Sequence, residues 1–357
     1  MHFSVHFPDD FPLDEIQRFG EQLIAESTVV PGFIAPDFGA LHPLAVRYMQ
    51  NIEDRPVTVI ADLNVISAIT SLSGETQKLA IDEFDRSIGM LMAVCQFNDI
   101  QIDPSIAIHE LAHSMGHDRA LKTLGQFMAA NNASPWEWLE LARGNECRIS
   151  TDACSAEDPG PLDRQLTRYR RNYLLALKIA SLELEVKLKP IERILTFLDW
   201  MNKNMYFAGP AALLAAMYMS PNARKSGLLS QLRSADRAKA LAGVRNQVWD
   251  ITHLGEFTRR IREVGDDSRL LFATKDKKLA AFALLVSINP DAEDIAREFS
   301  KWWSPTDATL LGSIFANMFD EAASDRRIPL GEKEVDWLDA EMATIEQQIL
   351  LWRTPAL

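Results

Sequence analysis

The chain has 357 residues, of which 47% are apolar, 24% charged and 8% aromatic, and its formal net charge is −13 at pH 7. This composition excludes collagen, low-complexity disorder and a disulfide scaffold, and it supplies apolar side chains for one large or two ordinary domains. Three cysteines without C-x-x-C spacing indicate a reducing compartment. The apolar runs are shorter than a bilayer span, and the N-terminus lacks a signal-peptide pattern, so we expect a cytoplasmic protein without a membrane partner.

The first half of the chain predicts an irregular start followed by alternating helices and strands. Prolines interrupt residues 1–50, where we expect one helix over residues 13–26. The β-branched run Val57–Ala61 predicts a buried strand, and a long helix over residues 76–97 and a second strand at 100–102 follow. Asp103 and Pro104 are residue types that begin helices, so we expect the next helix to start there and to carry His113.

The second half predicts mainly helices. Residues 121–248 have almost only helical patterns, with a loop at 152–161, and a third strand is expected at 270–274. Helices are expected over residues 278–286 and 332–351. Strands separated by helices predict an α/β fold, a small parallel sheet flanked by helices, with a large all-helical insertion. The expected parts are an N-terminal irregular and helical segment at 1–50, an α/β core at 51–120 and 245–290, the insertion at 121–244 and C-terminal helices at 291–357.

Charge is distributed unevenly along the chain. Residues 160–262 contain 18 basic and 8 acidic side chains, a formal charge of +10, whereas the remainder carries −23. The basic residues form two clusters, Arg164, Arg168, Arg170, Arg171 and Lys178, and then Arg224, Lys225, Arg233, Arg237, Lys239 and Arg245. Such asymmetry predicts a polyanion-binding face, for which Arg168, Arg170, Arg171, Arg233 and Arg237 are the candidate nucleic-acid-binding residues. The alternative is that the clusters are solvated faces of amphipathic helices.

Two aspartates follow predicted strands. Asp62 ends the segment Ile60-Ala61-Asp62, and Asp276 ends Thr274-Lys275-Asp276. Functional groups in parallel sheets collect at the carboxyl ends of strands. Carboxylates at that edge suit Mg²⁺ or Mn²⁺, which can activate water for phosphodiester cleavage. The alternative is that both aspartates serve only as turn or cap residues.

These motifs resemble those of the PIN-domain nucleases. Asp62-Leu63-Asn64 is similar to the first motif of that family, Glu110 in the segment 102–110 to the second, Asp250 to the third and Thr274-Lys275-Asp276 to the fourth. The resemblance implies a doubly wound α/β fold and a metal-dependent endoribonuclease, or sometimes a structure-specific DNA nuclease. It also implies that Asp62, Glu110, Asp250 and Asp276 hold the metal, with Asn64 and Thr274 orienting them.

The sequence departs from the PIN pattern in two places. Leu63 stands where the family often has a hydroxyl residue, and Glu110 lies 140 positions before Asp250. The long separation requires the helical insertion, and it leaves Asp266 or Asp267 as alternatives to Asp250 for the third acid.

A second motif, His109-Glu110-Leu111-Ala112-His113, is a literal H-E-x-x-H and is similar to zincin motifs. Two histidines four residues apart on one helical face can both bind Zn²⁺, with the glutamate as general base. A third ligand would be His117, which continues the stripe on the same helix, or Glu140 or Glu146. The metzincin pattern fails because position 119 is Arg.

Three functions therefore follow from the sequence. We expect a metal-dependent nuclease acting on RNA, because this interpretation accounts for Asp62, Asp276 and Glu110 together. A zinc-dependent metallohydrolase or peptidase built on His109 and His113 is the first alternative. The second is a non-catalytic protein that binds a second copy of itself or another protein through its helical insertion.

Overall fold

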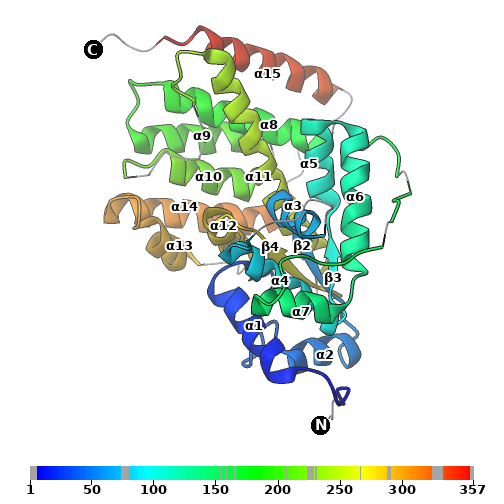
Figure 1. The fold of residues 1–357 in the computed structure, drawn as a ribbon. Helices are drawn as coiled ribbons and strands as arrows, with labels where there is room; N and C mark the ends of the chain where they lie inside the picture. The colour runs from blue at the N-terminus through cyan, green and yellow to red at the C-terminus, as the bar shows by residue number, and fades with distance from the viewer. Residues whose placement is uncertain are drawn as a thin grey trace. The chain divides into compact units, whose positions relative to one another are not determined.

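The computed structural model is mostly helical with one small mixed sheet, which agrees with a helix-rich α/β class (Figure 1). The chain divides into unit 1, Met1–Arg164 with Phe257–Ile288, and unit 2, Gln165–Glu256 with Asn289–Leu357. The structure describes residues 6–73, 80–152, 154–157, 159–164, 166–205, 207–222, 229, 231–265, 267–287, 291–323 and 333–353.

The sheet of unit 1 has the strand order β1-β4-β2-β3. Its strands are β1 Val29–Pro31, β2 Val57–Ala61, β3 Gln101–Asp103 and β4 Arg269–Ala273. Strand β2 is parallel to both β3 and β4, as expected, but β1 pairs antiparallel with β4. The expectation of a wholly parallel sheet was therefore wrong at β1. That strand has three residues, too few for a periodic pattern to reveal it.

The helices of unit 1 enclose a core of apolar side chains on both sides of these strands. They are α1 Leu13–Ala25, α2 Pro43–Asn51, α3 Leu63–Leu72, α4 Glu83–Phe97, α5 Ser105–Met115, α6 His117–Asn131, α7 Pro135–Arg143 and α12 Lys277–Ser287. Helix α4 is buried over most of its length and packs against α1 and α7. The fold therefore places α6 and α7 with the sheet, although the expected insertion began at residue 121.

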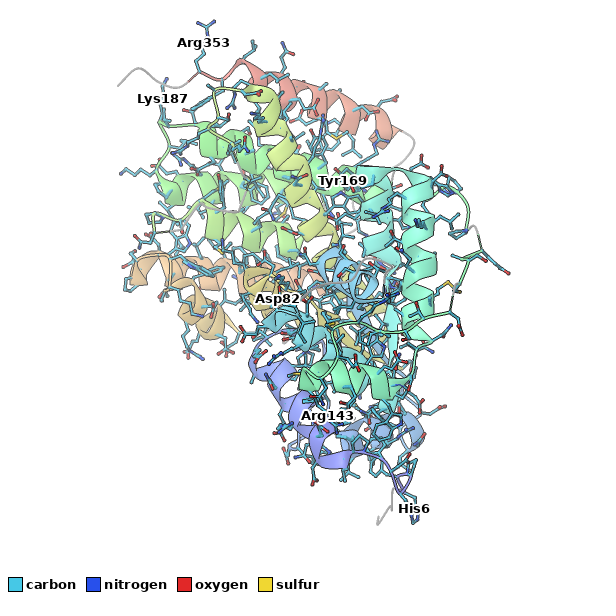
Figure 2. The ribbon with its side chains drawn as sticks, in the orientation of Figure 1. His6, Asp82, Arg143, Tyr169, Lys187 and Arg353 are labelled. Carbon is cyan, nitrogen blue, oxygen red and sulfur yellow. The ribbon has the colours of Figure 1, made fainter. Side chains whose placement is uncertain are left out.

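Three local features of unit 1 correct the sequence-based expectations. Helices α2 and α3 were not expected, and α3 begins directly after the strand because the Asp62 side chain accepts a hydrogen bond from the Val65 amide as its N-cap. The described part of the helix expected over 76–97 begins at Glu83, and residues 76–79 lie outside the described ranges. A reciprocal capping box explains that start: the Asp85 amide donates to Asp82 over 2.8 Å, and the Asp82 amide donates to Asp85 over 3.0 Å. Asp82 is labelled in Figure 2.

The junction between α5 and α6 breaks the predicted histidine stripe. Gly116 ends α5 with a φ of +90°, a backbone conformation that residues other than glycine rarely adopt. His117 therefore begins α6. The expectation that it continues the helix of His109 and His113 was wrong. The start of α5 also differs, because Pro104 occupies the N-cap and Asp103 accepts from the Ser105 amide over 2.8 Å.

Unit 2 consists of helices in the part that the structure describes, as the sequence predicts for most of it. They are α8 Thr167–Leu184, α9 Pro190–Asn204, α10 Gly209–Tyr218, the first part of α11 Arg237–Val264, α13 Ala292–Phe299, α14 Pro305–Ala323 and α15 Lys333–Leu351. From Phe257 onward, α11 belongs to unit 1. The last helix matches the expected 332–351, with residue 332 outside the description. Every helix within the described ranges is too short or too polar to cross a lipid bilayer.

A buried carboxylate stabilises unit 2 from within. The Glu183 side chain on α8 is fully buried and accepts from the Arg193 guanidinium on α9 over 3.0 Å and from Arg233 over 2.8 Å. Arg193 also donates to the Glu185 carbonyl over 3.1 Å. Because an unpaired buried charge is strongly unfavourable, these contacts make Glu183 a point on which the packing of α8 and α9 depends.

We expect Glu183→Ala to lower the free energy of unfolding by about 3–5 kcal/mol, because it leaves the buried Arg193 without its carboxylate. Urea denaturation followed by circular dichroism measures the change. Glu185→Ala, which removes an exposed carboxylate from the end of the same helix, serves as the control and should change stability by less than about 1 kcal/mol. Equal midpoints for the two variants would contradict this role of Glu183.

Candidate functional site at the carboxyl ends of the strands

Strands β2 and β4 end side by side. Their register pairs Ala61 with Ala273, and the Asp62 amide donates to the Ala273 carbonyl over 3.0 Å. Asp62 and Thr274 are the next residues of the two strands, so both lie at the carboxyl edge of the sheet. This is the edge at which parallel sheets collect functional groups.

The Asp62 carboxylate is buried, with 3% of the residue exposed, and it is held from three directions. The Thr274 hydroxyl donates to its Oδ2 atom over 2.5 Å, and the Val65 amide donates to Oδ1 over 2.9 Å. Asn64 makes a longer contact of 3.5 Å to Oδ2. An ionised carboxylate offers about four acceptor positions, and these donors fix the orientation of Asp62.

Asp276 is linked to Asp62 through Thr274. The Asp276 amide donates to the Thr274 hydroxyl oxygen over 3.0 Å, while that hydroxyl donates onward to Asp62. The Asp276 side chain is exposed and caps the first turn of α12 by accepting from the amides of Lys278, over 2.7 Å, and Leu279, over 3.2 Å. Each aspartate is therefore a helix cap, and both lie at one edge of the sheet.

The other predicted acids lie within helices and do not directly follow β2 or β4. Glu110 is half-buried on α5 of unit 1, the helix that follows β3. Asp250 belongs to unit 2 and lies in the interior of α11, where it accepts from Gln247 over 2.5 Å. The family pattern places an aspartate at the start of a helix, and Asp250 does not have that position. Of its alternatives, Asp267 is exposed in the turn before β4, and Asp266 lies outside the described residues.

The acids do not gather into a larger cluster in the part of the chain that the structure describes. Within those residues, no group of three or more His, Cys, Asp and Glu side chains is placed to hold a metal ion. The described edge therefore offers the pair Asp62 and Asp276, with Thr274 between them.

A further strand-end acid, Asp103, was interpreted from the sequence only as a helix cap. Arg260 of α11 donates to the Asp103 carboxylate through Nη1. The Nη2 atom of Arg260 lies 3.4 Å from the Ser105 hydroxyl. Burial by itself raises the pKa of Asp103, but hydrogen bonds from Ser105 and Arg260 and the charge of Arg260 outweigh it and lower that pKa below its ordinary value. The pair joins α11 to the start of α5, which carries Glu110. Nothing in the sequence around Arg260 marks it as the partner.

The three histidines of the predicted zinc motif contact the backbone of residues 162–164. His109 Nδ1 lies 2.8 Å from the Leu162 carbonyl and therefore donates, whereas His117 Nδ1 accepts from the Leu162 amide over 3.3 Å. His113 Nε2 lies 3.4 Å from the Arg164 carbonyl. Each ring thus uses one nitrogen to fasten this segment to α5 and α6. Of the acids considered as a third ligand, Glu140 accepts from Arg143 and Asn145, and Glu146 is exposed.

Several of the candidate nucleic-acid-binding arginines have partners within unit 2. Arg168 pairs with Glu256 and Arg170 with Asp339, while Arg171 is half-buried on the same helix. Arg233 pairs with Glu183 over 2.8 Å. Arg237 donates to the carbonyls of Ile349, Leu232 and Ser234, and burial lowers its pKa. Arg224 and Lys225 lie outside the described residues. These contacts give the described basic residues a role in packing α8, α11 and α15.

Comparisons with known proteins identify no relative. No protein-family model matches the chain, and no curated protein and no solved structure is similar to it.

We expect Thr274→Val to lower the free energy of unfolding by about 1–3 kcal/mol, because it leaves the buried Asp62 Oδ2 without its closest donor. Thr274→Ser keeps a hydroxyl at the same position and should retain most of the stability. Guanidinium denaturation of both variants at pH 7 measures the difference. If the serine and valine variants lose the same amount, the hydroxyl does not support Asp62.

We expect the stability lost in Arg260→Gln to depend on pH. The pKa of Asp103 is lower in the folded protein than its ordinary value, so ionised Asp103 favours the folded state above that value, and this contribution disappears as the pH falls through the folded-state pKa. The difference between wild type and Arg260→Gln should therefore be largest near neutral pH and shrink below about pH 4. Denaturation midpoints measured from pH 7 to pH 3 test this, and a constant difference would contradict it.

Proposed function

We propose that this chain is a metal-dependent hydrolase that cleaves phosphodiester bonds, with Asp62 and Asp276 as its central carboxylates. The observation that carries the proposal is the Thr274 hydroxyl, which bonds Asp62 on one side and the Asp276 amide on the other at the edge where β2 and β4 end. Two acids far apart in the sequence are thereby linked through a single side chain at the edge of the sheet.

The chemistry of this edge fits a hard divalent cation. Carboxylate and hydroxyl oxygens are the ligands that Mg²⁺ prefers, and Mg²⁺ typically binds one or two carboxylates and keeps several waters. Asp62 and Asp276 would supply the carboxylates. A bound divalent cation would supply Lewis acidity toward a phosphate oxygen and lower the pKa of water.

Other residues near this edge would orient or support the two carboxylates. Thr274 and Asn64 keep the Asp62 carboxylate in one orientation, and the Val65 amide fixes its other oxygen at the start of α3. Glu110 is the further acid of unit 1, on the helix whose start the Asp103–Arg260 pair holds. We place it as a supporting carboxylate, and we assign Asp250 no role because it lies in the interior of α11 and not at the start of a helix.

RNA is the substrate to test first, because the order of the four motifs resembles that of a ribonuclease family. The basic residues of unit 2 give this choice less support than their number in the sequence suggested, since the partners described above engage several of them. The zinc alternative has less support than the nuclease, because Gly116 interrupts the helix that would carry His117 as a third ligand, and Glu140 accepts from Arg143 and Asn145.

We expect the purified protein to cleave single-stranded RNA in the presence of Mg²⁺ or Mn²⁺ and to lose that activity in EDTA. Asp62→Asn and Asp276→Asn should each lower the rate by at least about a hundredfold, because both change the charge that binds the cation. Electrophoresis of a labelled RNA, with the equivalent DNA in parallel, measures the cleavage.

Asp9→Asn is the matched control, because Asp9 is an exposed aspartate of unit 1 in the segment before α1. Circular dichroism of each variant separates a loss of activity from a loss of fold. Cleavage that survives in folded Asp62→Asn, or that persists in EDTA, would refute the proposed function.

A further inference from the structure

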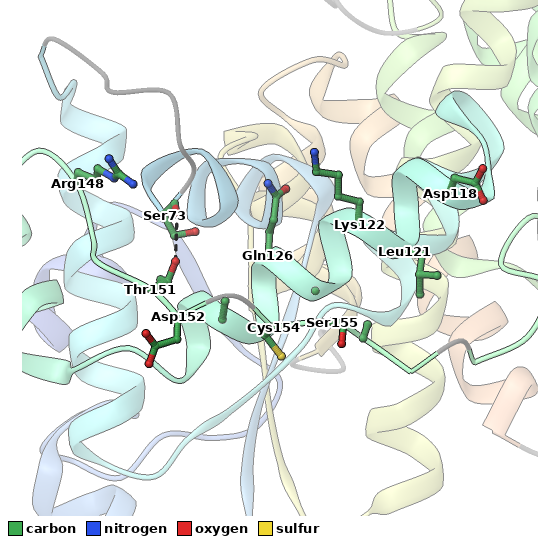
Figure 3. Close-up of a pocket in the computed structure, with 13 residues that line it drawn as sticks. Ser73, Asp118, Leu121, Lys122, Gln126, Arg148, Thr151, Asp152, Cys154 and Ser155 are labelled. Carbon is green, nitrogen blue, oxygen red and sulfur yellow. Dashed lines mark hydrogen bonds between the residues drawn. The ribbon is translucent and has the colours of Figure 1, made fainter.

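A pocket of about 570 Å³ lies between α6, the segment 148–156 and the end of α3, all within unit 1 (Figure 3). Its volume is in the range of small-molecule sites. The pocket is separate from the strand-end residues described above, because none of them lines it. The residues that the argument uses are Asp118, Lys122, Gln126, Arg148, Asp152 and Cys154.

The described residues of this segment, 148–152 and 154–156, form one wall and are hydrogen-bonded to the rest of unit 1. The Ile149 amide donates to the Leu72 carbonyl over 2.9 Å, and the Thr151 hydroxyl donates to the Ser73 carbonyl over 3.4 Å. Further along, the Cys154 carbonyl lies so close to α6 that a Cβ atom on Gly125 would meet it at 2.7 Å. The glycine therefore lets the segment rest directly on the helix, and the pocket has a defined wall.

The charges in this pocket have no partners among the described residues. Lys122 and Arg148 are exposed cations and Asp118 and Asp152 exposed acids, and none of the four forms an ion pair within the part of the chain that the structure describes. By contrast, Arg143 on the neighbouring α7 pairs with both Glu15 and Glu140. Figure 3 shows Lys122 and Gln126 on the same side of α6, with Arg148 and Asp152 on the opposite segment.

We propose that this pocket binds a small zwitterion of the amino-acid or dipeptide class. A ligand that carries only negative charge would face Asp118 and Asp152, and one that carries only positive charge would face Lys122 and Arg148. A ligand with a carboxylate and an ammonium group satisfies both pairs, and charge-assisted hydrogen bonds are the stronger ones. Gln126 supplies an amide that can both donate to and accept from a peptide group.

Cys154 provides a direct test, because it lines the pocket and Cys147 offers a partly exposed reference outside it. The protein is alkylated with iodoacetamide in the presence of L-alanyl-L-alanine, succinate or putrescine, and mass spectrometry follows each cysteine. We expect the dipeptide to slow the alkylation of Cys154 severalfold and to leave Cys147 unchanged. Succinate and putrescine at the same concentration should protect neither.

Calorimetric titration with L-alanyl-L-alanine then tests which charged side chains contact the ligand. Lys122→Gln and Asp152→Asn should each weaken binding about tenfold, since each removes a charged partner of the ligand. Arg119→Gln and Asp163→Asn are the matched controls, because they change exposed charges outside the pocket and should leave the affinity unchanged.

Three outcomes would overturn the inference. They are the absence of dipeptide binding at millimolar concentration, protection by succinate or putrescine as strong as that by the dipeptide, and equal losses in the pocket and control variants. These measurements do not use nuclease activity. The pocket proposal can therefore fail while the proposed function holds, and the proposed function can fail while the pocket proposal holds.

Discussion

The hydroxyl group of Thr274 is the contact on which the strand-end arrangement depends. It donates to a carboxylate that is almost completely buried, and it accepts from the backbone at Asp276. The parallel pairing of β2 with β4 makes this possible, because it brings the residues after Ala61 and Ala273 to the same edge. A buried carboxylate without such a donor would be strongly unfavourable, so the register of the sheet and the position of Asp62 support each other.

The two aspartates at this edge have structural roles that are compatible with a chemical one. Each caps the helix that follows its strand, Asp62 for α3 and Asp276 for α12. The hydrogen bonds of a helix cap use one or two acceptor positions of a carboxylate, and they fix the orientation of its side chain. The interpretation of these residues as simple caps and the interpretation as cation ligands are therefore not exclusive, and activity measurements distinguish them.

Several basic residues in the helical part of the sequence contact groups of their own unit. Arg233 and Arg193 both pair with the buried Glu183, and Arg237 is held by backbone carbonyls. A count of charges along a segment reports its composition but not which acid each base will contact in the folded unit. The cations and acids around the pocket of unit 1 are more informative about a ligand, because none of them forms an ion pair among the described residues.

The sequence by itself determined the local elements: β2 and α12 by their apolar and β-branched runs, the helix of Glu110, and the helical character of most described residues between 167 and 248. It also marked Asp62 and Asp276 as strand-end acids, since that position follows from a short strand followed by an aspartate. Only the tertiary structure decided that β1 runs antiparallel, that Thr274 joins the two acids, that Arg260 faces Asp103 and that Asp250 belongs to unit 2. The physical reason is that periodicity and capping act over a few neighbouring residues, whereas these contacts join residues that lie far apart along the chain and meet only when each unit folds.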